Sequence, residues 1–113
     1  MAGNFSLQIK SDNTDEFEKR LAQGCLEAFE EIGVIAEGYA KSACPVDTGR
    51  LRNSISFEAD DRKVSVGTNV EYAPYIELGT SKHSPQPFIR PSIEDHINQF
   101  RDIIVQELTN SVN

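Results

Sequence analysis

Two stretches of the chain place apolar residues at the three- and four-residue steps of a helix that buries one face. The first covers residues 15–43, and its apolar positions are Phe17, Leu21, Cys25, Ala28, Ile32, Ile35 or Ala36, Tyr39 and Ala43. The second begins near Ser92, and its apolar positions are Ile93, Ile97, Phe100, Ile104 and Leu108. The pattern therefore predicts a long helix in the first half of the chain and a second helix at its end.

Shorter segments alternate apolar and polar residues with the two-residue period of a half-buried strand. Phe5–Lys10 predicts a short first strand, and Ile55–Ala59 and Val64–Gly67 predict the two strands of a hairpin. The polar residues Asp60–Lys63 lie between these two and predict its turn. Phe88–Arg90 is a brief extended piece that could supply a further strand.

Capping and breaking residues place the ends of the two helices. Residues 11–15 offer several N-caps before the first helix, and acidic residues there suit the positive end of its dipole. Pro45 disfavours helical geometry at Cys44 and so predicts where that helix ends. Ser92 followed by Asp95 resembles a capping box at the start of the last helix.

The segment between the hairpin and the last helix has no strong period. Residues 73–79 predict one or two helical turns, with proline at the start and glycine at the end, and residues 81–87 predict an exposed loop. The element order predicts one α+β domain over residues 1–113. In it, a small mostly antiparallel sheet is packed by the long N-terminal helix and the C-terminal helix.

Composition and charge narrow the function classes. The chain has 113 residues, enough for one domain, and no apolar run approaches the roughly 20 residues needed to cross a membrane. Its start lacks the features of a signal peptide, so we expect a reducing cytoplasm. The net charge is −7, and the first 40 residues hold eight acids and three bases. An acidic chain is not typical of a protein that binds DNA directly.

The two cysteines are expected to be free thiols. Cys25 and Cys44 lie nineteen residues apart on the first predicted helix, a separation of roughly 28 Å at the helical rise, which is far beyond the reach of a disulfide. No second cysteine pair or histidine-rich segment suggests a zinc site, so we interpret both cysteines as small apolar residues.

Candidate catalytic and metal-binding residues are few. A hydrolase would need a pocket in which Ser54 lies near His83 or His96. No glycine elbow surrounds any serine. His83 and His96 with the neighbouring Glu94 and Asp95 are a conceivable but weak metal-ligand set. The glycines lie too far apart for a phosphate-binding loop. We therefore expect a protein that is not an enzyme and holds no cofactor and no metal.

The segment CPVDTGRLRNSI, residues 44–55, concentrates special residues between the long helix and the hairpin. Asp47 or Thr48 can cap a turn made by residues 49–53, and Leu51 can point inward. Its two arginines need acids or water as partners, and Glu77 is a candidate acid. Arg90, before a proline, is a further basic candidate.

Four blocks of sequence then carry a resemblance. PVDTGRL closes the long helix, and VGT, YAPYIELGT and QPFIRP follow in that order. Together they closely resemble the head-tail joining, or tail-completion, family of long-tailed bacteriophages and prophages, over nearly the whole chain. The motif residues, which are also candidate interface residues, are Asp47, Thr48, Gly49, Arg50, Leu51, Arg52, Tyr72, Pro74, Tyr75, Glu77, Gly79, Thr80, Pro87, Phe88, Arg90 and Pro91.

The resemblance implies a non-enzymatic structural protein of the virion at the neck, where head and tail meet. It implies a ring of identical subunits, with a hexamer among the candidate stoichiometries. The expected partners are the chain itself and neighbouring neck, head-completion and tail proteins, with DNA contact at most indirect and no membrane. The implied location is the virion, and the bacterial host cytoplasm during assembly.

Three hypotheses about contacts remain open at the level of the sequence. The acidic first helix and the basic residues of the later segment could attract one another between subunits. Alternatively, Arg50, Arg52, Arg62 and Lys63 could form a local basic patch of a small nucleic-acid-binding module. Ser81–Gln86 could also be a mobile loop that orders on docking.

Overall fold

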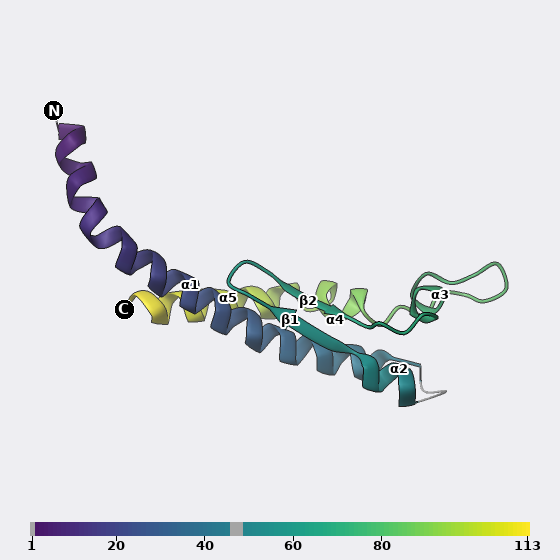
Figure 1. The fold of residues 1–113 in the computed structure, drawn as a ribbon. Coiled ribbons are helices and arrows are strands. Elements are labelled where there is room, and N and C mark those ends of the chain that lie inside the picture. The colour runs from purple at the N-terminus through teal and green to yellow at the C-terminus, as the bar shows by residue number, and fades with distance from the viewer. Residues whose placement is uncertain (1, 46–48) are drawn as a thin grey trace.

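The computed structural model describes residues 2–45 and 49–113, with side chains from residue 15 onward (Figure 1). Its elements in chain order are α1 (Ala2–Ala43), α2 (Gly49–Ser54), β1 (Ser56–Ala59), β2 (Val64–Gly67), α3 (Ala73–Leu78), α4 (Arg90–Glu94) and α5 (Ile97–Val112). The chain is therefore α+β, with a long N-terminal helix, one small antiparallel sheet and a C-terminal helix, as the element order predicts.

The molecule is elongated, with principal extents of 69 × 24 × 23 Å, because α1 runs along most of its length; α3 and the loop after it reach beyond the end of α1 (Figure 1). α1 contacts α4, α5 and both strands of the hairpin, so these elements form a second layer over one side of α1. None of the described helices is both long and apolar enough to cross a membrane.

Small residues on the inner face of α1 allow the second layer to come close. Ala28, Ala36 and Ala40 are fully buried. The predicted stripe includes Ala28 and Ala36, but near the end of α1 the buried residues are Ala40 and Cys44, and the predicted Ala43 is exposed. Ile32 and Ala36 pack with Phe100 of α5 in one apolar cluster. Ala40 belongs to a second cluster near the end of α1, which is described with the candidate site below.

The hairpin and its turn form where the alternation of the sequence predicts them. β1 and β2 pair antiparallel, with Phe57 opposite Val66 and Ala59 opposite Val64. The Asp60 carboxylate accepts the backbone N–H groups of Arg62 at 2.7 Å and Lys63 at 2.8 Å, which closes the turn. These two backbone hydrogen bonds lower the pKa of the Asp60 carboxyl.

Several predicted features are confirmed. α1 ends at Ala43, two residues before Pro45, and both cysteines are free. α3 carries Pro74 in its first turn and ends at Gly79. A short helix, α2, begins at Gly49, but its expected caps Asp47 and Thr48 lie outside the described residues.

The first predicted strand is wrong. Residues 5–10 belong to α1, which begins at Ala2 and continues without a break past the expected caps at residues 11–15. Alternation over six residues is a weak signal. A strand needs a neighbour for its backbone N–H and C=O groups, whereas a helix satisfies these groups within itself. The single sheet of the described chain consists of β1 and β2 alone.

The expectations for the end of the chain also need correction. Phe88–Arg90 is not a strand, because the N–H groups of these residues are bound by the Glu77 carboxylate and are not available for a sheet. The predicted C-terminal helix is two helices, α4 and α5, separated at residues 95–96. Ser92 does not cap a helix, since it lies inside α4 and its buried hydroxyl donates to the carbonyl of Ile89, the residue before α4.

Glycine at position 33 is required by the packing of the hairpin on α1. A Cβ atom at Gly33 would overlap the ring of Phe57, whereas a Cβ atom at Gly38 would meet no atom within 4 Å. Both glycines lie inside the same helix, where alanine is intrinsically favoured by about 0.5–1 kcal/mol. Alanine substitutions at the two positions therefore measure the effect of helix propensity and the effect of packing on stability separately.

We predict that Gly33→Ala lowers the free energy of unfolding by about 1–3 kcal/mol, because the Phe57 ring must shift. The matched control Gly38→Ala should raise it by about 0.5–1 kcal/mol. Urea unfolding followed by circular dichroism measures both. Equal stabilisation by the two substitutions would show that Phe57 does not pack on position 33.

Candidate functional site

The described motif residues gather at the end of the molecule where α1 stops. Leu51 of α2, Ala73 of α3 and Phe88 are 2%, 5% and 0% exposed and share one apolar cluster. Its other buried members are Ala40, Cys44, Ile55 and Val70. The blocks PVDTGRL, YAPYIELGT and QPFIRP, far apart in sequence, therefore each contribute a residue to the same core. Leu51 points inward, as predicted.

Glu77 holds two of these blocks together. Its Oε1 accepts the N–H groups of Phe88 at 3.1 Å and Ile89 at 3.0 Å, and its Oε2 accepts that of Arg90 at 3.1 Å. Burial raises the pKa of the Glu77 carboxyl, but the three backbone donors outweigh it and the net pKa is lowered. The carboxylate thus fixes the start of α4 against α3.

The loop after α3 is tied at its base. Gly79 has φ of 80°, a left-handed conformation that favours glycine, and a Cβ atom there would lie 2.8 Å from the Pro85 nitrogen. The Thr80 hydroxyl accepts the N–H groups of Lys82 and His83, and the Gln86 N–H donates to the Ile76 carbonyl. Residues 81–87 are exposed, as predicted, and these bonds define the shape of the loop.

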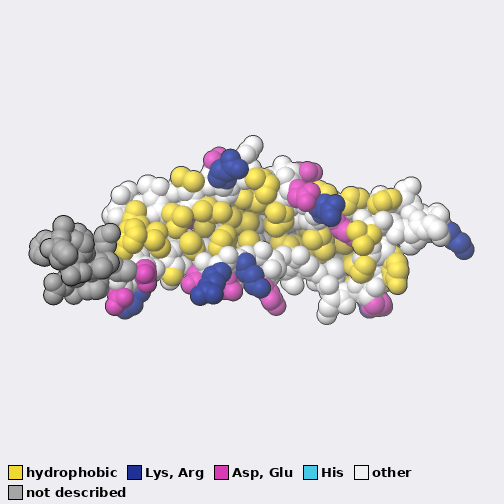
Figure 2. Space-filling model, turned by 90° about the horizontal axis from the view of Figure 1, so that it is seen from above, with side chains coloured by type: hydrophobic (Ala, Val, Ile, Leu, Met, Phe, Trp, Pro, Cys, Tyr) yellow, Lys and Arg dark blue, Asp and Glu magenta, His cyan; other side chains and the backbone are white. Residues whose placement is uncertain are grey.

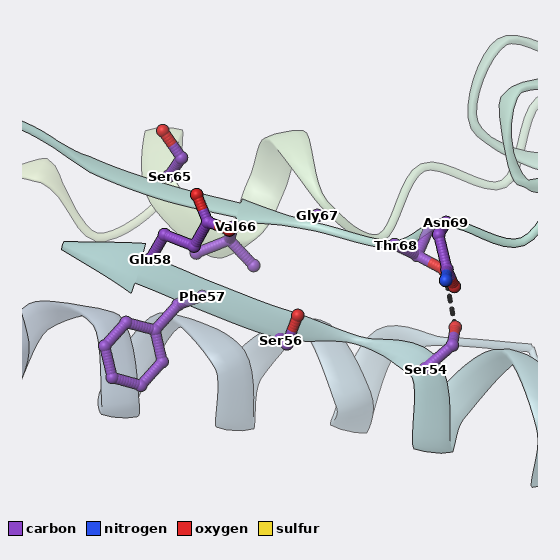
Figure 3. A pocket seen from close by; sticks show the side chains of 9 residues that line it. All are labelled: Ser54, Ser56, Phe57, Glu58, Ser65, Val66, Gly67, Thr68 and Asn69. Carbon is purple, nitrogen blue, oxygen red and sulfur yellow. Dashed lines mark hydrogen bonds between the residues drawn. The ribbon is translucent and has the colours of Figure 1, made fainter.

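A chain of hydroxyl groups joins α2 to the end of the hairpin. The hydroxyls of Thr68 and Ser54 are hydrogen-bonded to each other (Figure 3). Val70 N–H donates to Thr68 Oγ1, and Ser54 Oγ donates to the Leu51 carbonyl at 2.6 Å. Since Ser54 gives its proton to a backbone carbonyl, Thr68 is the donor between the two hydroxyls. Both hydroxyls are thus engaged in structural bonds.

Ser54 also borders a shallow depression of about 360 Å³ over the hairpin (Figure 3). Its lining residues are Ser54, Ser56, Phe57, Glu58, Ser65, Val66, Gly67, Thr68 and Asn69. Glu58 is its one ionisable side chain, and among the described residues no hydrogen bond joins its carboxylate to a serine hydroxyl, as activation of a serine nucleophile would need.

The two histidines are separated in the fold. His83 lies in the loop after α3, whereas His96 lies between α4 and α5 and stacks on Tyr39 with ring centroids 3.6 Å apart. Tyr39 in turn donates its hydroxyl to Gln99 at 2.7 Å. Among the described residues, no three His, Cys, Asp or Glu side chains are placed to hold a metal ion. The weak metal-ligand set considered from the sequence is therefore not brought together.

The arginines of α2 have different surroundings from those expected. Arg50 binds Glu71, with 3.1 Å and 3.3 Å between its Nη2 and the two carboxylate oxygens, and its guanidinium lies over the Tyr72 ring. The expected partner Glu77 instead accepts hydrogen bonds from backbone N–H groups. This ion pair is exposed, so it adds little stability. Arg52 has a buried Nε without a hydrogen-bond partner among the described residues.

The basic residues considered for DNA binding do not form one patch. Arg50 and Arg52 belong to α2, which precedes β1, whereas Arg62 and Lys63 belong to the turn at the other end of the hairpin (Figure 1). Arg90 pairs with Glu94 at 3.6 Å on α4. A phosphate backbone would therefore meet separate cations with acids beside them.

An apolar groove of about 530 Å³ lies beside the motif core, between the end of β2, α3 and the start of α4. Leu78, 70% exposed, and the exposed Pro74 border it on α3, and Arg90 borders it on α4. Its remaining lining residues are Gly67, Thr68, Asn69, Val70, Glu71, Ala73, Glu77 and Ile89. Leu78 was not among the candidate residues, because an isolated leucine in a short helix carries no sequence signal for exposure.

The motif residues therefore divide into two groups. Leu51, Glu77, Gly79, Phe88 and Thr80 have structural contacts that explain them. The exposed members are Gly49, Arg50, Pro74, Tyr75, Pro87 and Arg90, together with Thr80 from the first group, and Tyr75 is 64% exposed. Arg52, Tyr72 and Pro91 are half-buried, and Asp47 and Thr48 lie outside the described residues. The exposed group is the part available to a partner.

The chain belongs to a bacteriophage protein family. Residues 10–79, more than half of the chain, match the HK97-gp10-like family, which is described as "Bacteriophage HK97-gp10, putative tail-component". The match includes most of α1, the hairpin and α3. This agrees with the resemblance drawn from the motifs and makes the chain a phage structural protein associated with the virion. No curated protein and no solved structure matches the chain.

We predict that Glu77→Gln lowers the free energy of unfolding at pH 7 by about 2 kcal/mol, because an amide cannot replace both carboxylate oxygens as acceptors. The lowered pKa means that the native carboxylate contributes stability above the unfolded-state pKa of about 4.3. That contribution is lost as the pH falls through the native value. The difference between wild type and variant should therefore shrink in acid.

Urea unfolding at a series of pH values measures this effect. Glu71→Gln is the matched control, since its exposed ion pair with Arg50 should change stability little. A Glu77→Gln variant as stable as the control at pH 7 would contradict the role assigned to the carboxylate.

Proposed function

We propose that this protein is a non-enzymatic component of the phage neck that joins the head to the tail by assembling as a ring. The observation that carries the proposal is the family membership over residues 10–79 together with the four motif blocks in their order. The proposed partners are further copies of the chain and the neighbouring neck, head-completion and tail proteins.

The distribution of motif residues supports this proposal over an enzymatic one. The hydroxyl of Ser54 donates its proton to a backbone carbonyl, and the Glu77 carboxylate accepts three backbone N–H groups. Those groups hold the fold, whereas Leu78 and Arg90 remain exposed at the border of an apolar groove and Tyr75 is exposed elsewhere on α3. Exposed aromatic, apolar and arginine side chains are typical of protein–protein contacts.

The proposed site of action is the head-tail junction of the virion, reached from the host cytoplasm during assembly. DNA contact is at most indirect, because the cations of the hairpin turn and α2 lie at opposite ends of the hairpin (Figure 1). A ring needs two different contact surfaces on each subunit, and the elongated shape separates the two ends of the chain.

Electron microscopy of lysates tests the proposed function. We expect that a stop codon placed early in this reading frame, in the phage or prophage that encodes it, leaves full heads beside separate tails. Supplying the wild-type protein from a plasmid should restore joined virions, which controls for effects on neighbouring genes. Normal virions in the absence of the protein would refute a joining role.

A further inference from the structure

The first part of α1 extends beyond the rest of the molecule. Ser111, near the end of α5, lies against Gly24, where a Cβ atom would be 2.7 Å from its hydroxyl oxygen. α5 ends at Val112, so α1 continues past it without a neighbouring helix. Residues 15–20 are all exposed, and Phe17 is 50% exposed. We call residues 2–20 the arm; in Figure 1 it curves away from the C-terminus.

The arm needs a packing partner for physical reasons. At the helical rise, its nineteen residues span about 28 Å. A helical segment without tertiary contacts is only weakly stabilised in water, because most helical stability in proteins comes from burying an apolar face. Phe17 and the half-buried Leu21 lie four residues apart and so share one face of α1. Within the described chain, Phe17 is left half in solvent.

A second unpartnered surface runs along α5. Ile97, Val105 and Val112 are 46%, 57% and 37% exposed, and at 100° per residue they lie within about 80° of one another around the helix. The half-buried Ile104 and Leu108 lie beside them. We call these five residues the apolar strip. Figure 2 shows that apolar side chains form a continuous band on the face of the molecule seen in that view.

We propose that the arm of one copy packs along the apolar strip of the next copy, an inference that rests on the proposed ring assembly. The strip from Ile97 to Val112 is about 22 Å long, close to the length of the arm. The arm cannot cover the strip of its own chain, because α1 is continuous and leads away from α5 (Figure 1). Two different patches in contact make a head-to-tail interface, as a ring requires.

Charge also favours an arm as the occupant. Arg101 lies on the side of α5 that carries Ile97 and Val105, it is exposed, and it forms no salt bridge within the described residues. Glu18 borders the Phe17 face of the arm and likewise forms none. An arm lying on the strip would bring an acid to Arg101, and complementary charge of this kind sets register between partners.

Sedimentation velocity of the purified full-length protein tests the contact. We expect wild type to associate, and Phe17→Glu and Val105→Glu each to weaken association by at least about tenfold. Val34→Glu is the matched control, because Val34 is 61% exposed on α1 and belongs to neither surface. Circular dichroism should show all three variants folded, since each replaced side chain is at least half exposed.

Mixing the two interface variants identifies the geometry. Phe17→Glu keeps an intact strip and Val105→Glu keeps an intact arm, so the mixture should form a heterodimer and nothing larger. Glu18→Arg and Arg101→Glu should each weaken association, and the double variant should recover it. A wild-type monomer at the highest soluble concentration overturns the inference. So does normal association of Phe17→Glu, which would indicate that two strips face one another.

These outcomes are separate from those for the joining role. A monomeric wild type, together with full heads and separate tails in the stop-codon lysate, would leave the proposed function standing and remove the arm contact. Association through arm and strip, together with normal virions in the stop-codon lysate, would leave the arm contact standing and remove the proposed joining role.

Discussion

The close contact between α1 and the layer above it is the constraint on which the structure depends. The hairpin and α5 approach α1 across alanines that are fully buried and across Gly33, where the Phe57 ring occupies the place of a side chain. Larger residues at these positions would push the layers apart and expose both apolar clusters. The short strands and helices of the second layer are too small to form a core without this surface.

The second requirement is that the irregular half of the chain keep a defined shape. Glu77 supplies it by accepting the N–H groups of three consecutive residues, which lie in no regular hydrogen-bonding pattern at the start of α4. Gly79 and Thr80 then shape the loop between them. Because these contacts use the conspicuous residues of the family motifs, much of the motif signal reflects folding. The exposed remainder, including Tyr75 and Arg90, is left for contacts with other proteins.

The surfaces left open give a consistent picture of a component built for assembly. One end carries an apolar groove bordered by Leu78, the opposite end carries a helical arm, and α5 presents an apolar strip between them. Exposed apolar surfaces lower the solubility of an isolated subunit, whereas an assembled subunit can bury them. Membership of a phage tail-component family accords with that arrangement.

The sequence by itself determined the elements whose signals are local. These are the apolar stripe of α1, the end of α1 before Pro45, the alternation of the hairpin and the glycine that follows α3. It also determined the family, because four spaced motifs are specific as a set. Tertiary structure decided the rest. The sequence of Phe88–Arg90 resembles a strand. In the fold, however, the carboxylate of Glu77, eleven residues before Phe88, accepts the backbone N–H groups of all three residues. Likewise, which apolar residues stay exposed, such as Leu78 and Val105, depends on where neighbouring elements end, and no local pattern encodes that.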